Sequence, residues 1–183
     1  LIECASIDHG ESMQIQTTRF GSVEIKESDV IQFTEGLLGF GDLKGFVLLD
    51  DPDDDIFAWL QSSEKPEIAF PVLEPELFIP DYKISLSKRD MESLGLVEMK
   101  NYGVYTIITI PEDPTQMTAN LKAPIVINVK TKQARQCVLQ ENDLPIRQEI
   151  FSQLQQRLVQ GPMNGSKSEK NTDLTVRILP AEA

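Results

Sequence analysis

Histidine and cysteine are almost absent from this 183-residue chain. The only histidine is His9, and the two cysteines are Cys4 and Cys137. We expect residues 1–12 to be a non-native leader or a piece of an upstream segment, because they show no clear periodicity and precede Met13, which resembles a natural start. The rest of the chain then lacks a Ser-His-Asp triad, a Cys-His pair and a histidine metal site. The sequence therefore predicts no enzyme, no catalytic residue, no cofactor and no metal.

Basic residues and long apolar runs are also scarce. There are 17 lysines and arginines against 29 acids, which gives a formal net charge of −12. A nucleic-acid binder needs a basic surface to displace counterions from phosphate, so this balance argues against nucleic acid and favours a basic protein partner. No apolar run approaches the roughly 18 residues that cross a membrane, and the first residues do not have the charged-then-apolar pattern expected of a signal peptide. One cysteine outside the leader excludes an internal disulfide there and fits a reducing cytoplasm. Within a β-rich chain, we expect Cys137 to be a small buried hydrophobe.

Short apolar segments separated by turn residues fill the chain from Met13 to about Leu139. Val23 and Ile25 alternate with polar neighbours, which is typical of a half-buried strand. Such short, closely spaced strands predict a mainly β fold, with a small antiparallel β-barrel-like domain at residues 13–140. A short helix is expected at residues 88–94, with Gly95 as its stop. Strands are expected at residues 20–26, 29–33, 46–49, 57–61, 68–72, 82–86, 102–110, 125–129 and 134–139.

A different pattern begins after Asn142 and predicts a C-terminal extension over residues 141–183. Pro145 suits the first position of a helix that should run over about residues 145–160. Its apolar residues recur at intervals of four, so the helix would pack on the barrel or dock a partner. Residues 161–170 are expected to be a flexible linker and residues 174–179 a candidate edge strand. The apolar stripe comprises Ile146, Ile150, Phe151, Leu154 and Leu158.

Two segments suggest ligand binding, but the spacing of their residues does not match the known motifs. The run Asp51–Asp55 resembles the start of a calcium loop, but its sixth and twelfth positions are Ile56 and Ser62, where an EF-hand has glycine and glutamate. The glycines at 36, 39, 41 and 45 do not match a nucleotide-binding loop, which would need glycine at position 44. We therefore predict a solvated acidic turn and a set of turn glycines, and we expect Trp59 to pack in the core.

Several short motifs carry more information through their order and spacing over residues 13–140 than any one does alone. They are Met13–Thr17 with Phe20-Gly21, Phe33–Phe40, Phe57–Ser62, Ala69-Phe70, Pro80–Tyr82, Ile110–Pro114, Met117–Leu121 and Ala123–Asn128. In this arrangement the chain resembles the FliW family of flagellar assembly factors. The resemblance implies a small β-barrel-like fold without enzymatic activity, located in the cytoplasm.

The resemblance also implies two protein partners. FliW proteins bind flagellin before its export, and they bind the RNA-binding regulator CsrA and antagonise its repression of flagellin translation. We therefore expect flagellin and CsrA as partners, and neither direct nucleic acid nor membrane. One alternative is a flagellin-binding chaperone without CsrA control. A nucleic-acid-binding OB-like barrel is another, although the acidic charge argues against it.

We expect partner contacts in the loops, where side chains are exposed. The acidic loop would suit a basic partner, and two turns would add apolar and polar contacts. The alternative is that Phe40 and Asn120 are structural, holding turns and filling the end of the barrel. The predicted contact residues are Asp53, Asp54, Asp55, Leu37, Leu38, Phe40, Thr118 and Asn120.

Overall fold

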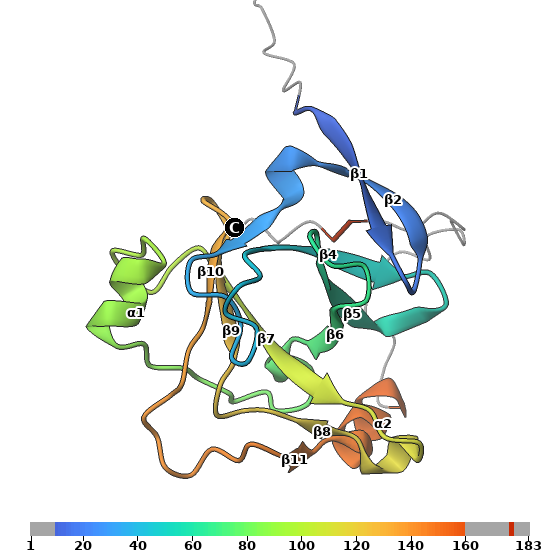
Figure 1. Ribbon diagram of the computed structural model, residues 1–183. Helices are drawn as coiled ribbons and strands as arrows, with labels where there is room; N and C mark the ends of the chain where they lie inside the picture. The colour runs from blue at the N-terminus through green and yellow to red at the C-terminus, as the bar shows by residue number, and fades with distance from the viewer. Residues whose placement is uncertain (1–9, 160–175, 178–183) are drawn as a thin grey trace, which may run out of the picture.

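Seven strands close into a β-barrel (Figure 1). The computed structural model describes residues 10–159 and 176–177. Around the barrel the strands follow the order β7-β6-β5-β4-β3-β10-β9, and β9 pairs with β7 to complete the ring. Every pairing is antiparallel except that of β10 with β3. The predicted barrel is confirmed, with one parallel pair. Its strands are β3 (Ile31–Phe33), β4 (Gly45–Asp51), β5 (Asp54–Ser62), β6 (Ala69–Leu73), β7 (Tyr102–Thr109), β9 (Ile125–Asn128) and β10 (Gln133–Gln136).

The barrel strands are buried on both faces because other elements cover the outside. Successive side chains of a strand point to opposite faces. Phe46 and Leu48 of β4 therefore join the interior cluster with Ile125 and Ile127 of β9. Val126 lies between Ile125 and Ile127 in the sequence and joins a second cluster outside the barrel. Both faces of these strands thus contribute apolar contacts to the fold.

A hairpin of β1 (Ser12–Thr17) and β2 (Gly21–Lys26) forms a separate two-stranded sheet. Its buried Ile15, Val23 and Ile25 pack against Val47 and Leu49, the β4 residues that face away from the interior. The alternation predicted for β2 is confirmed, since the residues between Val23 and Ile25 and on either side of them are exposed. The 3-10 helix η1 (Glu27–Asp29) connects the hairpin to β3.

The connection from β6 to β7 covers one outer face of the barrel. It contains the 3-10 helix η2 (Pro75–Leu77) and the helix α1 (Lys88–Ser93). The predicted short helix is confirmed: the Ser87 side chain accepts a hydrogen bond from the Asp90 amide at its start, and Gly95 follows its end with φ +64°.

The strand predicted at residues 82–86 is wrong. Tyr82 is buried and Ile84 and Leu86 are partly buried, so the alternation is real, and all three pack on the outer cluster. The segment nevertheless joins no strand ladder in the described structure. Alternate side chains are buried there against the outer cluster, and this burial does not require backbone pairing.

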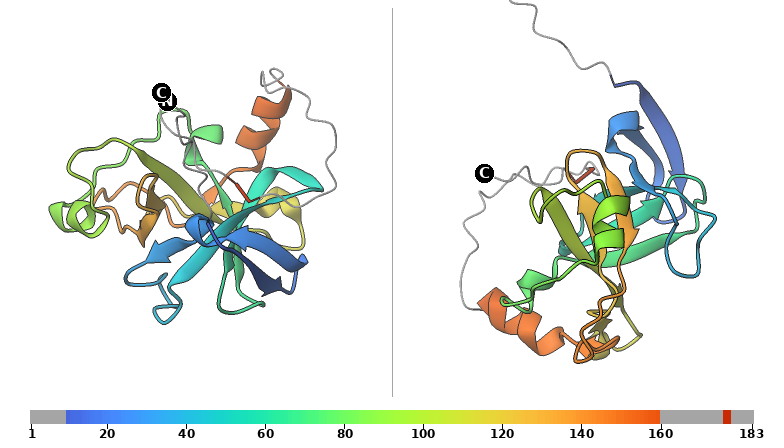
Figure 2. Two further views of the ribbon diagram at one scale, coloured as in Figure 1. Left: turned by 90° about the horizontal axis from the view of Figure 1, so that it is seen from above. Right: turned by 90° about the vertical axis from the view of Figure 1, so that its left-hand side faces the viewer.

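The chain beyond β10 returns to the barrel before it becomes helical. β11 (Gln148–Glu149) pairs with β8 (Thr118–Ala119), which follows the 3-10 helix η3 (Pro114–Gln116). The helix α2 (Phe151–Val159) therefore begins at residue 151 and not at Pro145 as predicted. The Pro145 carbonyl accepts a hydrogen bond from the Leu121 amide, 3.1 Å, which holds this stretch extended. Figure 2 shows α2 beside η3.

The predicted apolar stripe divides between core and surface. Ile150 and Leu154 are buried in the outer cluster, and Phe151 packs against it, whereas Ile146 is 65% exposed. The side chain of Leu158, residues 1–9 of the expected leader and the expected linker at 161–170 lie outside the described residues. Ser12, the last residue of the expected leader, belongs to β1. Of the candidate edge strand at 174–179, the structure describes Val176 and Arg177. The boundary at residues 140 and 141 stays a prediction.

Candidate protein-binding turn

The turn Gly36–Phe40 presents one exposed apolar side chain on a tight backbone. Leu37 and Phe40 form a bridge, with the Phe40 amide donating to the Leu37 carbonyl at 2.8 Å. Gly36 has φ +71°, and a Cβ there would lie 2.6 Å from the Phe40 carbonyl oxygen. Gly39 has φ +85°, also in the left-handed region that favours glycine. The backbone thus holds Leu38 at the tip, with the residue 60% exposed.

The other two apolar residues of this turn fix it to the barrel. Leu37 is 2% exposed and belongs to the interior cluster. Phe40 is partly buried and meets Phe70 of β6 edge to face, with ring centroids 5.1 Å apart. This geometry supports the structural alternative for Phe40. Of the three apolar residues predicted as partner contacts, Leu38 is the exposed one.

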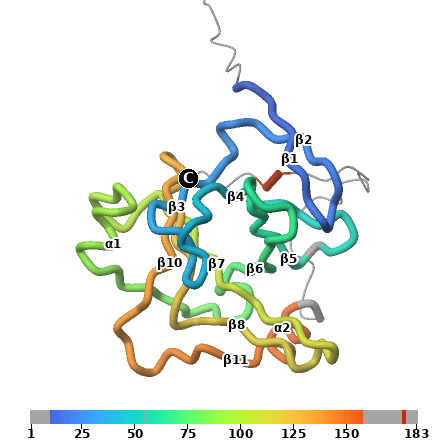
Figure 3. Tube along the Cα trace, viewed as in Figure 1, coloured from blue at the N-terminus to red at the C-terminus, as the bar shows by residue number. Residues whose placement is uncertain are grey.

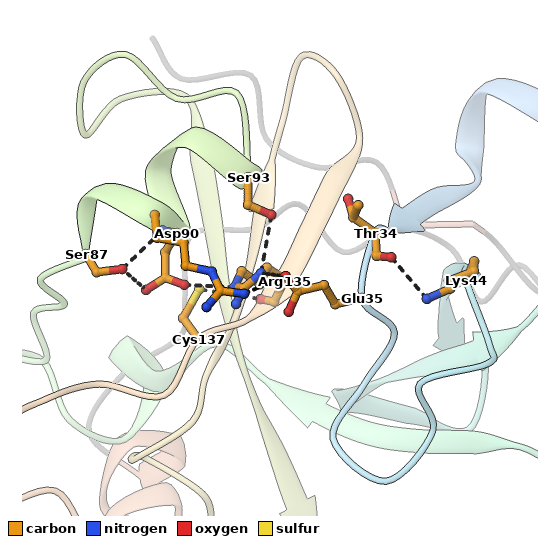
Figure 4. Close-up of polar contacts among 9 residues, drawn as sticks. Thr34, Glu35, Lys44, Ser87, Asp90, Ser93, Arg135 and Cys137 are labelled. Atoms are coloured by element: carbon orange, nitrogen blue, oxygen red, sulfur yellow. Dashed lines mark hydrogen bonds and ion pairs between the residues drawn. The ribbon is translucent and has the colours of Figure 1, made fainter.

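Strand β10 braces the turn through two neighbouring side chains. β10 and β3 run parallel, with Ala134 opposite Phe33. The residues that follow Phe33 therefore lie beside those that follow Ala134. Arg135 Nη1 lies 2.6 Å from Glu35 Oε1 (Figure 4). The Leu38 amide donates to Gln136 Oε1 at 3.0 Å. The turn is therefore held at its start and at its tip.

The Arg135 guanidinium also connects the turn to helix α1. Its Nε lies 2.8 Å from Asp90 Oδ1 (Figure 4). Arg89 of the same helix reaches Glu35 Oε1 at 3.4 Å. The Arg135 side chain is only 14% exposed. Its hydrogen bond to Glu35 lowers the pKa of Glu35 and raises the pKa of Arg135, although burial opposes both changes. Both groups therefore stay ionised at neutral pH.

Cys137 follows the bracing residues and is inert. It is fully buried, as predicted for a small apolar residue. Burial, with a smaller contribution from the negative charge of Asp90, raises the pKa of the thiol to about 12. The thiolate is the nucleophilic form, so the buried thiol is unreactive near neutral pH.

The predicted acidic loop lies elsewhere, between β4 and β5. In both Figure 1 and Figure 2 this connection is on the side of the barrel opposite α1. Asp53 is exposed, whereas Asp54 is partly buried and accepts hydrogen bonds from the amides of Ile56, 2.8 Å, and Phe57, 3.3 Å. Asp54 therefore shapes the start of β5. The side chain of Asp55 lies outside the described residues.

The last predicted pair, Thr118 and Asn120, is partly buried. Thr118 pairs with Thr109 of β7 and Glu149 of β11. Asn120 Oδ1 accepts hydrogen bonds from the amides of Lys122 and Ala123, both at 3.1 Å, which supports its structural alternative. Gln136 Nε2 donates to the Ala123 carbonyl at 3.1 Å. The structure thus links the Asn120 turn to the Leu38 turn through Gln136, while the acidic loop lies apart.

Sequence reasoning missed Glu35, Asp90, Arg135 and Gln136, the polar residues that position Leu38. Glu35 and Arg135 lie 100 positions apart, so no local spacing relates them. The sequence around this glutamate does not indicate which basic residue it pairs with. The parallel pairing of β10 with β3, which brings them together, is a tertiary feature.

The described part of the chain holds neither a cluster of metal ligands nor a membrane-spanning helix. No group of three or more histidine, cysteine, aspartate or glutamate residues there is placed to hold a metal ion. Among the described helices, none has the length and apolar content to cross a bilayer. The best-organised feature is the rigid turn that carries Leu38.

Comparison with known proteins identifies the family to which this chain is similar. A family model described as FliW protein matches residues 14–150. The chain belongs to the FliW family. It is 62% identical over 157 residues to the flagellar assembly factor FliW of Bdellovibrio bacteriovorus, covering 86% of this chain and 90% of that relative. It is 35% identical over 162 residues to FliW of Alkaliphilus metalliredigens, covering 88% of this chain and all of that relative.

The fold of the FliW family is shared as well. A crystal structure titled as that of the flagellar assembly factor FliW superposes with a TM-score of 0.71 and 34% sequence identity. The superposition covers 76% of this chain and 97% of the other. The FliW family match also extends to Ile150, beyond the residue 140 that the sequence motifs reach. It therefore includes β11, the strand that pairs with β8.

Proposed function

We propose that this chain is a flagellar assembly factor that binds flagellin in the bacterial cytoplasm and antagonises the translational repressor CsrA. The curated FliW relatives carry the name flagellar assembly factor. The chain acts by binding and not by catalysis: partner exchange between flagellin and CsrA requires surfaces and no reacting group. The observation that carries this proposal is the braced turn with Leu38 at its tip.

The Leu38 turn suits protein binding because it is ordered before a partner arrives. Ordering a loop during association costs free energy, and a preformed loop avoids that cost. Here the Glu35–Arg135 ion pair, the Gln136 hydrogen bond and the buried Leu37 fix the backbone. An exposed leucine on a rigid loop can fill an apolar pocket of a partner, which is how a few residues come to supply most of the affinity.

The acidic charge supports the CsrA half of the proposal. The chain carries a formal net charge of −12. A protein that holds RNA presents basic groups to phosphate, and an acidic partner is attracted to such a surface and repels the RNA. The acidic loop with Asp53 is the proposed contact of this kind.

Isothermal titration calorimetry with flagellin and CsrA from the same organism tests both halves. We expect the wild-type chain to bind each partner, and flagellin to displace CsrA. Leu38→Asp should weaken flagellin binding about tenfold or more, which corresponds to about 1.4 kcal/mol. Val97→Asp is the matched control, because Val97 is another loop aliphatic residue and is 98% exposed. Equal affinity of wild type and Leu38→Asp for flagellin would exclude the turn as the contact.

The same titrations separate the alternatives. Binding to flagellin without binding to CsrA would leave a flagellin chaperone and remove translational control. Asp53→Lys should weaken the CsrA complex specifically and with a strong dependence on salt. If the chain alone shifted the electrophoretic mobility of labelled RNA, and salt reversed the shift, this would instead support the alternative of a nucleic-acid-binding barrel.

A further inference from the structure

Strand β4 is longer than the strand beside it, and this leaves part of its edge open. The register of β3 with β4 contains Ile31 opposite Phe46 and Gln32 opposite Gly45, and stops there. β4 continues to Asp51. The stretch Leu48–Asp50 is therefore paired with β5 on one side and not with β3 on the other. An open strand edge presents backbone groups that readily pair with another extended segment.

Two residues from the far end of the chain occupy this open edge (Figure 3, red segment beside β4). Val176 forms an antiparallel bridge with Leu49, and the Arg177 amide donates to the Leu48 carbonyl at 2.9 Å. The Val176 side chain packs against the cluster formed by β4 and the β1–β2 hairpin. The edge thus accepts an extended segment through one backbone hydrogen bond and one apolar contact.

The side chain of Arg177 adds a specific anchor. Its Nη2 and Nε both lie 2.6 Å from Asp50 Oδ1, and its Nη1 lies 3.7 Å from Glu74 Oε1. The guanidinium also interacts electrostatically with the side chain of Tyr105, a residue of the barrel interior. Arg177 is 23% exposed, so most of it lies within this acidic niche. A planar guanidinium between two carboxylates is a charge-assisted arrangement that lysine reproduces poorly.

A hollow of about 490 Å³ adjoins this anchor. Glu74 and Tyr105 belong both to its lining and to the contacts of Arg177. The rest of the lining includes Tyr82, Ile84 and Tyr102. A segment that places an arginine on Asp50 and Glu74 therefore has aromatic and apolar surface beside that arginine.

From these contacts we infer that the open edge of β4 is a docking site for an extended protein segment with a β-branched residue followed by arginine. Leu48–Asp50 supply the strand edge, Asp50 and Glu74 bind the arginine, and the hollow adjoins the bound guanidinium. The chain's own Val176-Arg177 occupies the site and competes with a partner segment. A linked segment is present at an effective concentration on the order of millimolar, so the partner binds weakly until Val176-Arg177 is displaced.

A labelled peptide with the sequence of residues 172–181 tests this competition by fluorescence anisotropy. We expect the full chain with Arg177→Ala to bind the peptide at least tenfold more tightly than the wild type does, because its own arginine no longer competes. A peptide with glutamate in place of its arginine should not bind. Adding Asp50→Asn to the Arg177→Ala chain should abolish peptide binding, and adding Asp53→Asn should leave it unchanged. Equal binding by wild type and Arg177→Ala, or no binding by either, would overturn the inference.

Hydrogen exchange on the wild type gives a second result that does not depend on how the variants fold. Saturating peptide should speed exchange of the Arg177 amide, which loses the Leu48 carbonyl, and leave the amides between β4 and β5 protected. If the peptide binds but the exchange rate of the Arg177 amide does not change, the β4 edge is not the docking site.

Discussion

Replacing Ile150 with alanine removes a side chain from the cluster that joins the end of the chain to the barrel. Ile150 is 0% exposed and packs there with Leu154, Met117 and Leu139. Truncation of a buried isoleucine loses its transfer free energy and leaves a cavity, which together cost about 2–5 kcal/mol. For the fully buried Ile150 we expect a loss near the middle of this range, at about 3–4 kcal/mol. In a chain of this size the midpoint of thermal unfolding falls by roughly 2–4 °C per kcal/mol, so we expect a decrease of roughly 6–16 °C.

Urea and thermal unfolding, followed by circular dichroism, measure this change in the free energy of unfolding. Ile146→Ala is the matched control, since Ile146 lies four residues earlier and is 65% exposed. Its effect should stay within about 0.5 kcal/mol. If both variants were equally stable, or if Ile150→Ala matched the wild type, the packing of β11 and α2 on the barrel would not contribute to folding as the structure implies.

Two further predictions concern the Leu38 turn. Gly36→Ala should destabilise the fold far more than Gly39→Ala: both have positive φ, which costs about 1–2 kcal/mol, but an added Cβ at Gly36 would lie 2.6 Å from backbone and at Gly39 meets nothing within 4 Å. Urea unfolding measures the free energy of unfolding of both variants, and equal decreases would contradict this prediction. The second is a pH dependence. Arg135 lowers the pKa of Glu35, so this group stabilises the fold above its unfolded pKa, about 4.3, and the contribution disappears as the pH falls through the folded value. Glu35→Gln should therefore be less stable than wild type at pH 7 and approach it below about pH 4, and a gap that does not change with pH would refute the ion pair's role.

The sequence predicted those parts of the fold that depend on short-range patterns. The alternation of Val23 and Ile25 correctly gave a strand with one buried face. Gly95 correctly marked the end of α1, because only a residue that tolerates positive φ continues the chain there. The same rule of alternation failed at residues 82–86, where the buried residues were identified but the strand was not. Periodicity reports which side chains are buried, whereas a strand also needs backbone hydrogen bonds to a neighbouring strand.

Sequence spacing also placed the C-terminal helix too early. Pro145 suits the first turn of a helix, yet its carbonyl bonds Leu121 and the next residues pair with β8. A tertiary pairing partner outweighed the local preference, which is worth only tenths of a kcal/mol per residue. Similarly, the sequence proposed Asn120 and Asp54 as contacts, and the structure shows both side chains holding backbone amides.

By itself the sequence determined the family motifs, the mainly β character, the acidic charge and the presence of Leu38 in a glycine-bounded turn. These follow from residue types and their spacing along the chain, which local sterics and burial translate directly into structure. Only the tertiary structure decided that Leu38 is the exposed member of that turn and that Glu35 meets Arg135. It also decided that Val176-Arg177 fills the edge of β4. Those contacts join residues up to 129 positions apart, and they depend on how the strands are arranged in three dimensions, which no local pattern encodes.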